Sequence, residues 1–283
     1  MGKYNLTEAR IARKLKQKCG AGRGAAYVPW LTVGEVPSIG EAVRLLDPIH
    51  RRVMHVLSRL EFGVVLDLFW RRDVTEVREQ FPLDREATRA VATDMGVRHP
   101  SNGVIDIVMT TDFLVDHCLF DGSTAQVAVC VKPTAQLENG RVLEKIEIER
   151  RYWMRYGVPL RLVTEHEVNE RRRDILQWLY EWRWLDTVAV PHTSYWEERC
   201  EVLIAELLAT DAASDVRLAL FLDELESRRS WPRGEALSAL RHLGAIKRVV
   251  LPLETFDPAG ALGQVRVADT EPRSSGARNV RAA

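Results

Sequence analysis

The sequence predicts an α+β protein, with a central mixed β-sheet in its N-terminal part and a mostly helical C-terminal part. Three observations support this prediction. Apolar alternation typical of strands recurs before residue 165, helical periodicity dominates residues 170–250, and a polar tail spaced by Gly and Pro follows. A chain of 283 residues can bury a sizeable core, and we expect two domains.

The N-terminal segment, residues 1–47, is expected to be a basic arm followed by a Gly-rich stretch. The first twenty residues set one acid, Glu8, against six basic side chains: Lys3, Arg10, Arg13, Lys14, Lys16 and Lys18. Such an arm suits phosphate groups, although a solvated helix fits the same composition. The stretch after it, GAGRGAAYVPWLTVGEVPSIG, is predicted to be extended and looped.

Residues 48–168 are expected to form one domain of alternating strands and helices. The predicted strands are 51–57, 74–83, 104–116, 125–132 and 158–164, and the predicted helices are 58–70, 84–95 and 143–156. Ser58 is a good N-cap, and Gly96 can end a helix in the left-handed conformation. Thr164 and Glu167 match the capping-box pattern, which predicts a further helix directly after them.

Residues 169–257 are predicted to be nearly all helical. They end with SWPRGEALSALRHLGAIKRVVLPLE, which predicts a helix, a glycine and one or two short strands. This order is compatible with a winged helix. Residues 258–283 are polar and spaced by Gly and Pro, so we expect a disordered tail.

The composition argues against several classes of protein. No apolar run approaches the roughly 20 residues that a membrane span needs, and no signal peptide is visible. The four cysteines, at positions 19, 118, 130 and 200, form no CxxC pair and no metal-binding spacing. We therefore expect reduced thiols in a cytoplasmic protein without a membrane partner.

Two of the predicted strands carry charged residues on the same face of the sheet. Because side chains alternate between faces, Asp112 shares a face with Thr110 and Leu114, and Lys132 shares one with Cys130. If 104–116 and 125–132 pair as an antiparallel hairpin, Asp112 and Lys132 lie on the same side, within a pairing or two of each other.

An aspartate beside a lysine, with a second acid nearby, is the set of groups that metal-dependent phosphodiester hydrolysis needs. Mg²⁺ prefers oxygen ligands, and a lysine can position water and offset the charge that builds on the phosphate. The pattern is the outline of the restriction-endonuclease-like nucleases. The alternative is an edge strand whose last residue, Lys132, reaches solvent and guards against aggregation.

Three further side chains are candidates for the same site. Glu61 is the natural second acid, although with Ser58 it also matches the capping-box pattern. Glu149 lies on an apolar helical stripe and points partly inward, where it would lie near a metal or form a salt bridge with an arginine. His99 would contact phosphate or simply close the loop after a helix.

Eight blocks succeed one another along the chain: GRGAAYVPWLTVGEVPSIG, HVLSRLE, VTEVREQFPL, VRHP, VMTTDFLVD, VAVCVKP, LEKIEIERRYW and YGVPLRLVTEHEV. In this order and spacing they resemble the TnsA family, the endonuclease subunits of heteromeric DNA transposases. The resemblance covers residues 20–170, and REQFPL, MTTDFLVD and KxxIERxYW are its most specific motifs. The C-terminal half resembles the family more weakly, as a helical, winged-helix-like domain.

The resemblance implies a restriction-endonuclease-like domain that cuts DNA at transposon ends with Mg²⁺, for which Mn²⁺ can substitute. The family's catalytic acid falls on Glu61, its strand aspartate on Asp112 and its lysine on Lys132. The sequence departs at Cys130, where the family has Gln and related nucleases have Asp or Glu. Since a thiol is a poor Mg²⁺ ligand, the metal would rest on Glu61, Asp112 and the main-chain carbonyl near Val131.

The resemblance also implies partners. A TnsB-like DDE transposase would cut and join the 3′ ends while this chain frees the 5′ ends, and a TnsC-like AAA+ ATPase would contact the C-terminal domain or tail. Double-stranded DNA would be held through phosphate contacts from Arg10, Arg13, Lys14, Lys16, Lys18 and Arg23. Two alternatives stay open: a free-standing restriction or repair nuclease of this fold, and an inactive DNA-binding scaffold whose site has decayed at Cys130.

Overall fold

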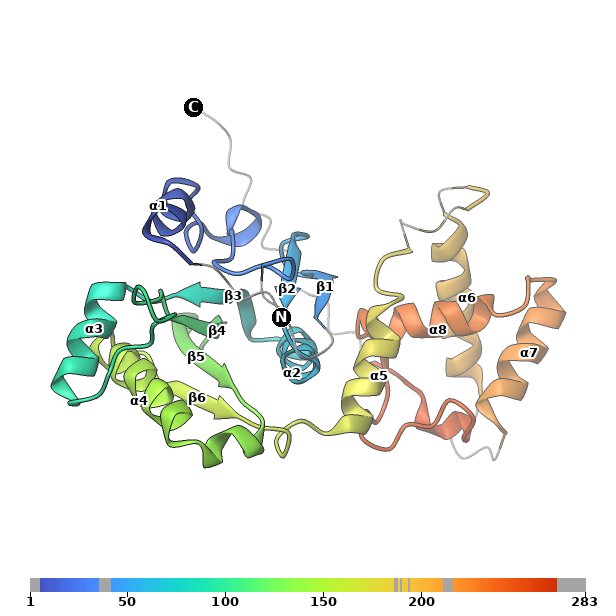
Figure 1. Ribbon diagram of the computed structural model, residues 1–283. Coiled ribbons are helices and arrows are strands. Elements are labelled where there is room, and N and C mark those ends of the chain that lie inside the picture. The colour runs from blue at the N-terminus through green and yellow to red at the C-terminus, as the bar shows by residue number, and fades with distance from the viewer. Residues whose placement is uncertain are drawn as a thin grey trace. The chain divides into compact units, whose positions relative to one another are not determined.

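The computed structural model describes residues 6–35, 42–185, 188, 190–192, 194–210 and 216–268. The chain forms two compact units, Met1–Arg173 and Asp174–Ala283. The four-stranded sheet belongs to the first unit, and the second is mostly helical (Figure 1). Among the described residues, no helix combines the length and the apolar character that a bilayer crossing requires.

The first unit is built on a four-stranded sheet with the order β3-β4-β5-β6. Its strands are β3 (Val74–Pro82), β4 (Thr110–Cys118), β5 (Thr124–Val131) and β6 (Leu160–Val163). The pairs β3–β4 and β4–β5 are antiparallel, and β6 runs parallel to β5. The prediction of an α+β protein with a central mixed sheet is confirmed.

The predicted strand 104–116 is wrong over its first half, because β4 begins only at Thr110. The side chain of Asn102 accepts hydrogen bonds from the backbone nitrogens of Val104 and Ile105 and holds this stretch in a loop. Ile105 and Ile107 pack against the cluster of Leu6, Ile11 and Trp30. Ile105, Ile107 and Val108, which suggested a strand, therefore contact the N-terminal segment, and only Met109 joins the core over the sheet.

Helices α1 (Glu8–Lys16), α2 (Arg59–Trp70), α3 (Arg85–Asp94) and α4 (Gly140–Arg155) surround the sheet, with short 3₁₀ turns at Gly24–Ala26 and Thr134–Glu138. A separate antiparallel pair is formed by β1 (Val43–Leu46) and β2 (Val53–Val56). The predicted arm and Gly-rich segment, residues 1–47, thus includes the helix α1 and the strand β1. Its residues 1–5 and 36–41 lie outside the described part.

One face of the sheet is covered by α3 and α4 (Figure 1). The core there joins Val91 of α3 and Ile148 of α4 to Leu114 of β4 and Ala128 of β5, all at most 2% exposed. This packing decides which side chains of β4 and β5 face α3 and α4, while the side chains on the opposite face, such as Phe113 and Val129, are buried as well.

The caps that the sequence predicts at α2 and α3 are confirmed. The Ser58 side chain accepts a hydrogen bond from the Glu61 backbone nitrogen at 3.1 Å, and Gly96 follows α3 with φ of 66°. The predicted helix start at Thr164 is wrong. Thr164 donates two hydrogen bonds to the Glu167 carboxylate, but these close a turn, and α5 (Glu170–Tyr180) begins later, with the Asn169 side chain accepting from its first turn.

The second unit contains most of α5 and the helices α6 (Tyr195–Ala209), α7 (Leu218–Arg229) and α8 (Glu235–Ala245). After α8, β7 (Val249–Val250) pairs antiparallel with β8 (Arg266–Val267). The predicted tail therefore needs correction over residues 258–268, which carry a 3₁₀ turn at Leu262–Gln264 and the strand β8. They are ordered because Leu262 and Val265 are buried. Residues 269–283 lie outside the described part.

A buried ion pair ties β2 to the central sheet. The Arg52 guanidinium donates to both carboxylate oxygens of Glu79 at 2.9 and 2.6 Å and to the Val77 carbonyl at 2.6 Å. Glu79 is fully buried and also accepts from the His55 backbone nitrogen. Burial raises the pKa of Glu79, and the hydrogen bonds from Arg52 offset part of that effect.

We expect Arg52→Met to lower the free energy of unfolding by about 3–5 kcal/mol, because the Glu79 carboxylate then stays buried without its partner. The double variant Arg52→Met/Glu79→Met should recover much of that loss. Urea unfolding followed by circular dichroism measures both.

A matched control is Arg71→Met, which breaks a half-exposed pair with Asp73 and should cost less than about 1 kcal/mol. Equal losses for Arg52→Met and Arg71→Met would contradict a structural role for the buried pair.

Candidate active site

The structure brings Asp112 and Lys132 together at the end of the β4–β5 hairpin. The Lys132 ammonium donates to Asp112 Oδ2 at 2.8 Å and to the Val131 carbonyl at 2.8 Å. The same carboxylate oxygen accepts from the Val131 backbone nitrogen at 2.7 Å. The predicted proximity of these two side chains is confirmed.

Lys132 does not follow an edge strand. β5 pairs with β4 on one side and β6 on the other, and the Lys132 backbone nitrogen donates to the Val163 carbonyl. Pro133 comes next and has no N–H to continue the ladder. The alternative of a solvent-facing lysine that guards an edge is therefore wrong. Burial opposes the charge of Lys132, but the Asp112 carboxylate outweighs it and raises the pKa of the ammonium well above its usual value.

Glu61 fulfils the capping function that its position suggests and also faces the site. Its carboxylate accepts from the Leu57 backbone nitrogen at 3.0 Å and from the Ser58 hydroxyl at 3.1 Å. Glu61 is 7% exposed. Burial, followed by repulsion from the Asp112 carboxylate, raises the pKa of Glu61 to about 7. The two carboxylates therefore lie close enough to influence each other's charge.

Glu149 of α4 approaches the same place from the packed face of the sheet. It is 5% exposed, and it hydrogen-bonds Thr111 and Cys130 rather than an arginine. Its Oε1 atom has no hydrogen-bond partner. Burial, with a further contribution from Asp112, raises the pKa of Glu149 to about 7. The expected salt bridge to an arginine is absent from the ion pairs of the described residues.

Cys130 is 1% exposed, and burial raises the pKa of its thiol. The thiol therefore stays protonated at neutral pH. A neutral thiol is a poor ligand for a hard cation, which agrees with the expectation that Cys130 supplies no ligand.

His99 lies apart from the pair of Asp112 and Lys132. One ring nitrogen is 3.0 Å from the Thr88 hydroxyl and the other 3.1 Å from the Pro100 carbonyl. Burial lowers the pKa of His99, so its ring is neutral at pH 7. The residue closes the loop after α3, as the structural alternative held.

The basic residues near the N-terminus divide into two groups. Lys14 is buried, and its ammonium donates to the Trp30 carbonyl and, at 2.7 Å, to Glu35, which also pairs with Arg10 at 2.9 Å. Arg23 pairs with Glu76 at 3.0 Å and with Asp116. These three side chains hold the N-terminal segment in place. Arg13, Lys16 and Lys18 are exposed, and Lys3 lies outside the described part of the chain.

The sequence predicted at most that Gln80 satisfies buried backbone groups in its strand, but its side chain also reaches the site. The amide of this buried residue lies 3.5 Å from Glu61 Oε2. The available signal was a polar residue in the middle of an apolar strand.

The oxygen atoms at this place fit a hard divalent cation. In the described part of the chain, no group of three or more His, Cys, Asp and Glu side chains is arranged to hold a metal ion. Asp112, Glu61 and the Val131 carbonyl nevertheless supply oxygen donors, which Mg²⁺ and Mn²⁺ prefer. The Lys132 ammonium already lies against two of them, so these oxygens favour a positive charge.

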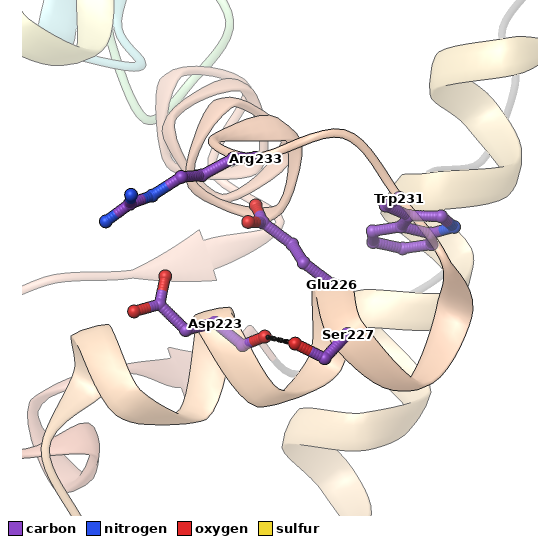
Figure 2. A pocket seen from close by; sticks show the side chains of 5 residues that line it. All are labelled: Asp223, Glu226, Ser227, Trp231 and Arg233. Carbon is purple, nitrogen blue, oxygen red and sulfur yellow. Dashed lines mark hydrogen bonds between the residues drawn. The ribbon is translucent and has the colours of Figure 1, made fainter.

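The second unit holds a pocket of about 230 Å³, lined by Asp223, Glu226, Ser227, Trp231 and Arg233 (Figure 2). The Glu226 carboxylate accepts hydrogen bonds from the backbone nitrogens of Gly234 and Ala236. This acid therefore serves the start of α8 and is not free for chemistry, so the active-site candidate remains the one in the first unit.

Comparison with known proteins agrees with this location. Residues 71–165 match the family model of the TnsA-like endonuclease N-terminal domain, and residues 167–253 match that of the TnsA endonuclease C-terminal domain. The Transposon Tn7 transposition protein TnsA of Escherichia coli is 46% identical over 182 residues, which are 64% of this chain and 66% of that protein. The match thus spans slightly less than two thirds of the relative's length. Asp112 and Lys132 lie inside the first matched region, and Glu61 precedes it.

We expect Glu149→Gln to raise the melting temperature at pH 8. The folded chain holds the Glu149 proton up to about pH 7, while the unfolded chain releases it near 4.5, so wild-type stability falls as the pH rises between these values. The difference corresponds to at most roughly 3 kcal/mol. Thermal unfolding from pH 4 to pH 8 should show the gain above pH 7 and its disappearance below pH 4.5.

Glu147→Gln, on the same helix, is the control, and it should lower the melting temperature at pH 8 instead of raising it. Its hydrogen bond from Arg150 lowers the pKa of Glu147 to about 2, so its charge stabilises the fold above pH 4.5. A melting temperature for Glu149→Gln that is no higher than wild type at pH 8 would contradict the burial argument.

Proposed function

We propose, because this chain belongs to the TnsA endonuclease family, that it is the DNA endonuclease subunit of a transposase. It would free the 5′ ends of its transposon by phosphodiester hydrolysis, leaving a 3′-hydroxyl and a 5′-phosphate. The observation that carries the proposal is the 2.8 Å contact between the Lys132 ammonium and the Asp112 carboxylate. Glu61 supplies the second acid beside them.

Lys132 acts as a fixed positive charge. Although burial opposes its charge, Asp112 raises the pKa of Lys132, so the ammonium keeps its proton at neutral pH and is not a general base. It contacts a phosphate oxygen of the scissile group, offsets the negative charge that builds there and orients the attacking water. The contact with Asp112 holds the ammonium at the strand end before DNA arrives.

Glu61, Asp112 and the Val131 carbonyl would hold Mg²⁺, or Mn²⁺ in its place. When bound, the ion aligns water with the phosphodiester and stabilises charge on the leaving oxygen. With the cation bound, Glu61 would be ionised, because a nearby positive charge offsets the burial and the repulsion from Asp112 that raise its pKa. Glu149 and Cys130 are buried next to this site. Because burial raises the pKa of both groups, the Glu149 carboxyl and the Cys130 thiol are neutral at pH 6 and below.

The proposal also assigns a fold to each of the two domains. A mixed sheet with an aspartate and a lysine on neighbouring strands supports a restriction-endonuclease-like fold for residues 48–168. The order of α8 and the antiparallel pair β7–β8 supports a winged helix for residues 169–257, whose second strand, β8, lies beyond that range at Arg266–Val267.

Double-stranded DNA, a TnsB-like DDE transposase and a TnsC-like AAA+ ATPase are the proposed partners. The transposase would cut and join the 3′ ends, so each end is released by two different active sites. Arg13, Lys16 and Lys18 are exposed and suit phosphate contacts, whereas Lys14 is occupied by the fold.

Asp112→Ala and Lys132→Ala should each lower 5′-end cleavage by roughly 10²–10³-fold, because each removes a charge that acts on the reacting phosphate. Nicking of end-labelled transposon-end DNA, with Mg²⁺ and the partner transposase present, measures the loss. A gel-shift assay should find DNA binding unchanged, since neither residue supplies the exposed basic surface.

Asp121→Ala, in the exposed turn of the β4–β5 hairpin, is the matched control and should cleave like wild type. Cleavage that survives both site variants would overturn the site. An inactive wild type that still binds DNA would support the scaffold instead, and efficient cleavage by the chain alone would support a free-standing nuclease.

Cys130→Ala should keep cleavage within about tenfold of wild type, because a neutral, buried thiol holds no Mg²⁺. The small cavity that it leaves should cost about 1 kcal/mol of stability. The same nicking assay and a melting curve check both values. A loss as large as that of Asp112→Ala would show that the thiol takes part in the reaction.

A further inference from the structure

Gln80 occupies the position beside Asp112 on the neighbouring strand. The register of β3 and β4 pairs Glu79 with Phe113 and Phe81 with Thr111, so Gln80 stands opposite Asp112. On the other side of Asp112, the β4–β5 register leads to Cys130, whose buried thiol offers no strong polar contact. Of the two residues opposite Asp112 on the neighbouring strands, Gln80 is therefore the one with a polar side chain.

The backbone of Gln80 adopts a conformation that glutamine rarely takes. Its φ is 46°, in the left-handed region, within a strand that is otherwise extended. The Gln80 carbonyl accepts a hydrogen bond from the Trp30 backbone nitrogen at 3.2 Å, which helps to hold this conformation. Backbone strain of this kind persists only where the surrounding structure enforces it, and it concentrates at functional sites.

The conformation turns the Gln80 side chain toward α2. The side-chain oxygen accepts from the Thr110 hydroxyl at 3.2 Å, which leaves the amide nitrogen facing Glu61 Oε2 at 3.5 Å. Gln80 is only 2% exposed, so the amide has no water to replace these contacts. The other two donors to the Glu61 carboxylate, Leu57 and Ser58, belong to the start of its own helix.

We infer that Gln80 is a positioning residue, which fixes the direction of the Glu61 carboxylate toward Asp112 from the sheet side. The inference rests on the proposed function, since it assigns the residue that aims one of the proposed metal ligands. If the Glu61 carboxylate were held only by the capping box of its own helix, it would move with α2 relative to the sheet. An amide anchored to β3 and Thr110 ties it to the strand that carries Asp112. An uncharged amide also adds no charge that would repel a cation.

A purely structural Gln80 makes a different prediction. In that case the amide only satisfies buried polar groups, and its loss lowers stability without acting through Glu61. The two roles are separated by measuring metal binding directly and by asking whether the effect of Gln80 depends on Glu61.

The test compares Gln80→Met with wild type, using the full chain and Mn²⁺ in isothermal titration calorimetry. Methionine keeps the length of the side chain and removes the amide. We expect Mn²⁺ binding to weaken by roughly 10–100-fold, the usual cost of losing a group that orients a metal ligand. In a Glu61→Gln background, Gln80→Met should weaken it by less than about twofold further.

Gln126→Met is the matched control. The Gln126 amide donates to the Asp116 carboxylate at 2.7 Å, so the change removes a shorter amide–carboxylate contact that lies away from the site. It should leave Mn²⁺ binding unchanged. If Gln80→Met does not fold, Gln80→Asn carries the test, because asparagine tolerates the left-handed conformation but is too short to reach Glu61. It should also weaken Mn²⁺ binding by at least about tenfold.

The outcomes separate this inference from the proposed function. A wild type that binds Mn²⁺ and cleaves DNA, beside a folded Gln80 variant that does both equally well, would overturn the inference alone. The same holds if the loss persists in full in the Glu61→Gln background. A wild type that neither binds Mn²⁺ nor cleaves would remove the proposed function and the inference together.

Discussion

The short contact between the Lys132 ammonium and the Asp112 carboxylate depends on the register of one hairpin and in turn determines the chemistry of the site. A slip of one residue between β4 and β5 would turn one of the two side chains to the opposite face. β6 opposes such a slip because it pairs with the other edge of β5. There, the backbone nitrogen of Lys132 donates a hydrogen bond to the Val163 carbonyl of β6. The ammonium is thus held beside two oxygen atoms before any ligand arrives.

This arrangement concentrates negative charge in a poorly solvated place. Glu61, Asp112 and Glu149 lie around a single ammonium, and the raised pKa values of the two glutamates measure the resulting repulsion and burial. A core built only for stability would not keep these acids. A divalent cation would relieve the repulsion, so the features that weaken the fold are those that favour the proposed chemistry.

The N-terminal segment illustrates how charge can be used for folding instead of binding. The sequence places Lys14 in the basic arm and Arg23 in the Gly-rich stretch after it, yet Lys14 is buried against Glu35 and Arg23 pairs with Glu76 at the sheet. Their partners lie far along the chain or in a loop, so a count of charges does not separate them from the exposed Lys16 and Lys18. The basic surface left for DNA is smaller than the sequence suggests.

The sequence by itself determined the features that local periodicity and capping encode. Alternation placed β3 and β5, Ser58 marked the start of α2, and the faces of Asp112 and Lys132 came from the two-residue repeat of a strand. Only the tertiary structure decided that Ile105, Ile107 and Val108 lie in a loop against the N-terminal cluster of Leu6, Ile11 and Trp30, and that Gln80 turns toward Glu61. Both outcomes depend on contacts between segments that are distant in sequence, and such contacts do not appear in a local sequence pattern. By contrast, the face of a strand residue and the cap of a helix are set by residues only a few positions away.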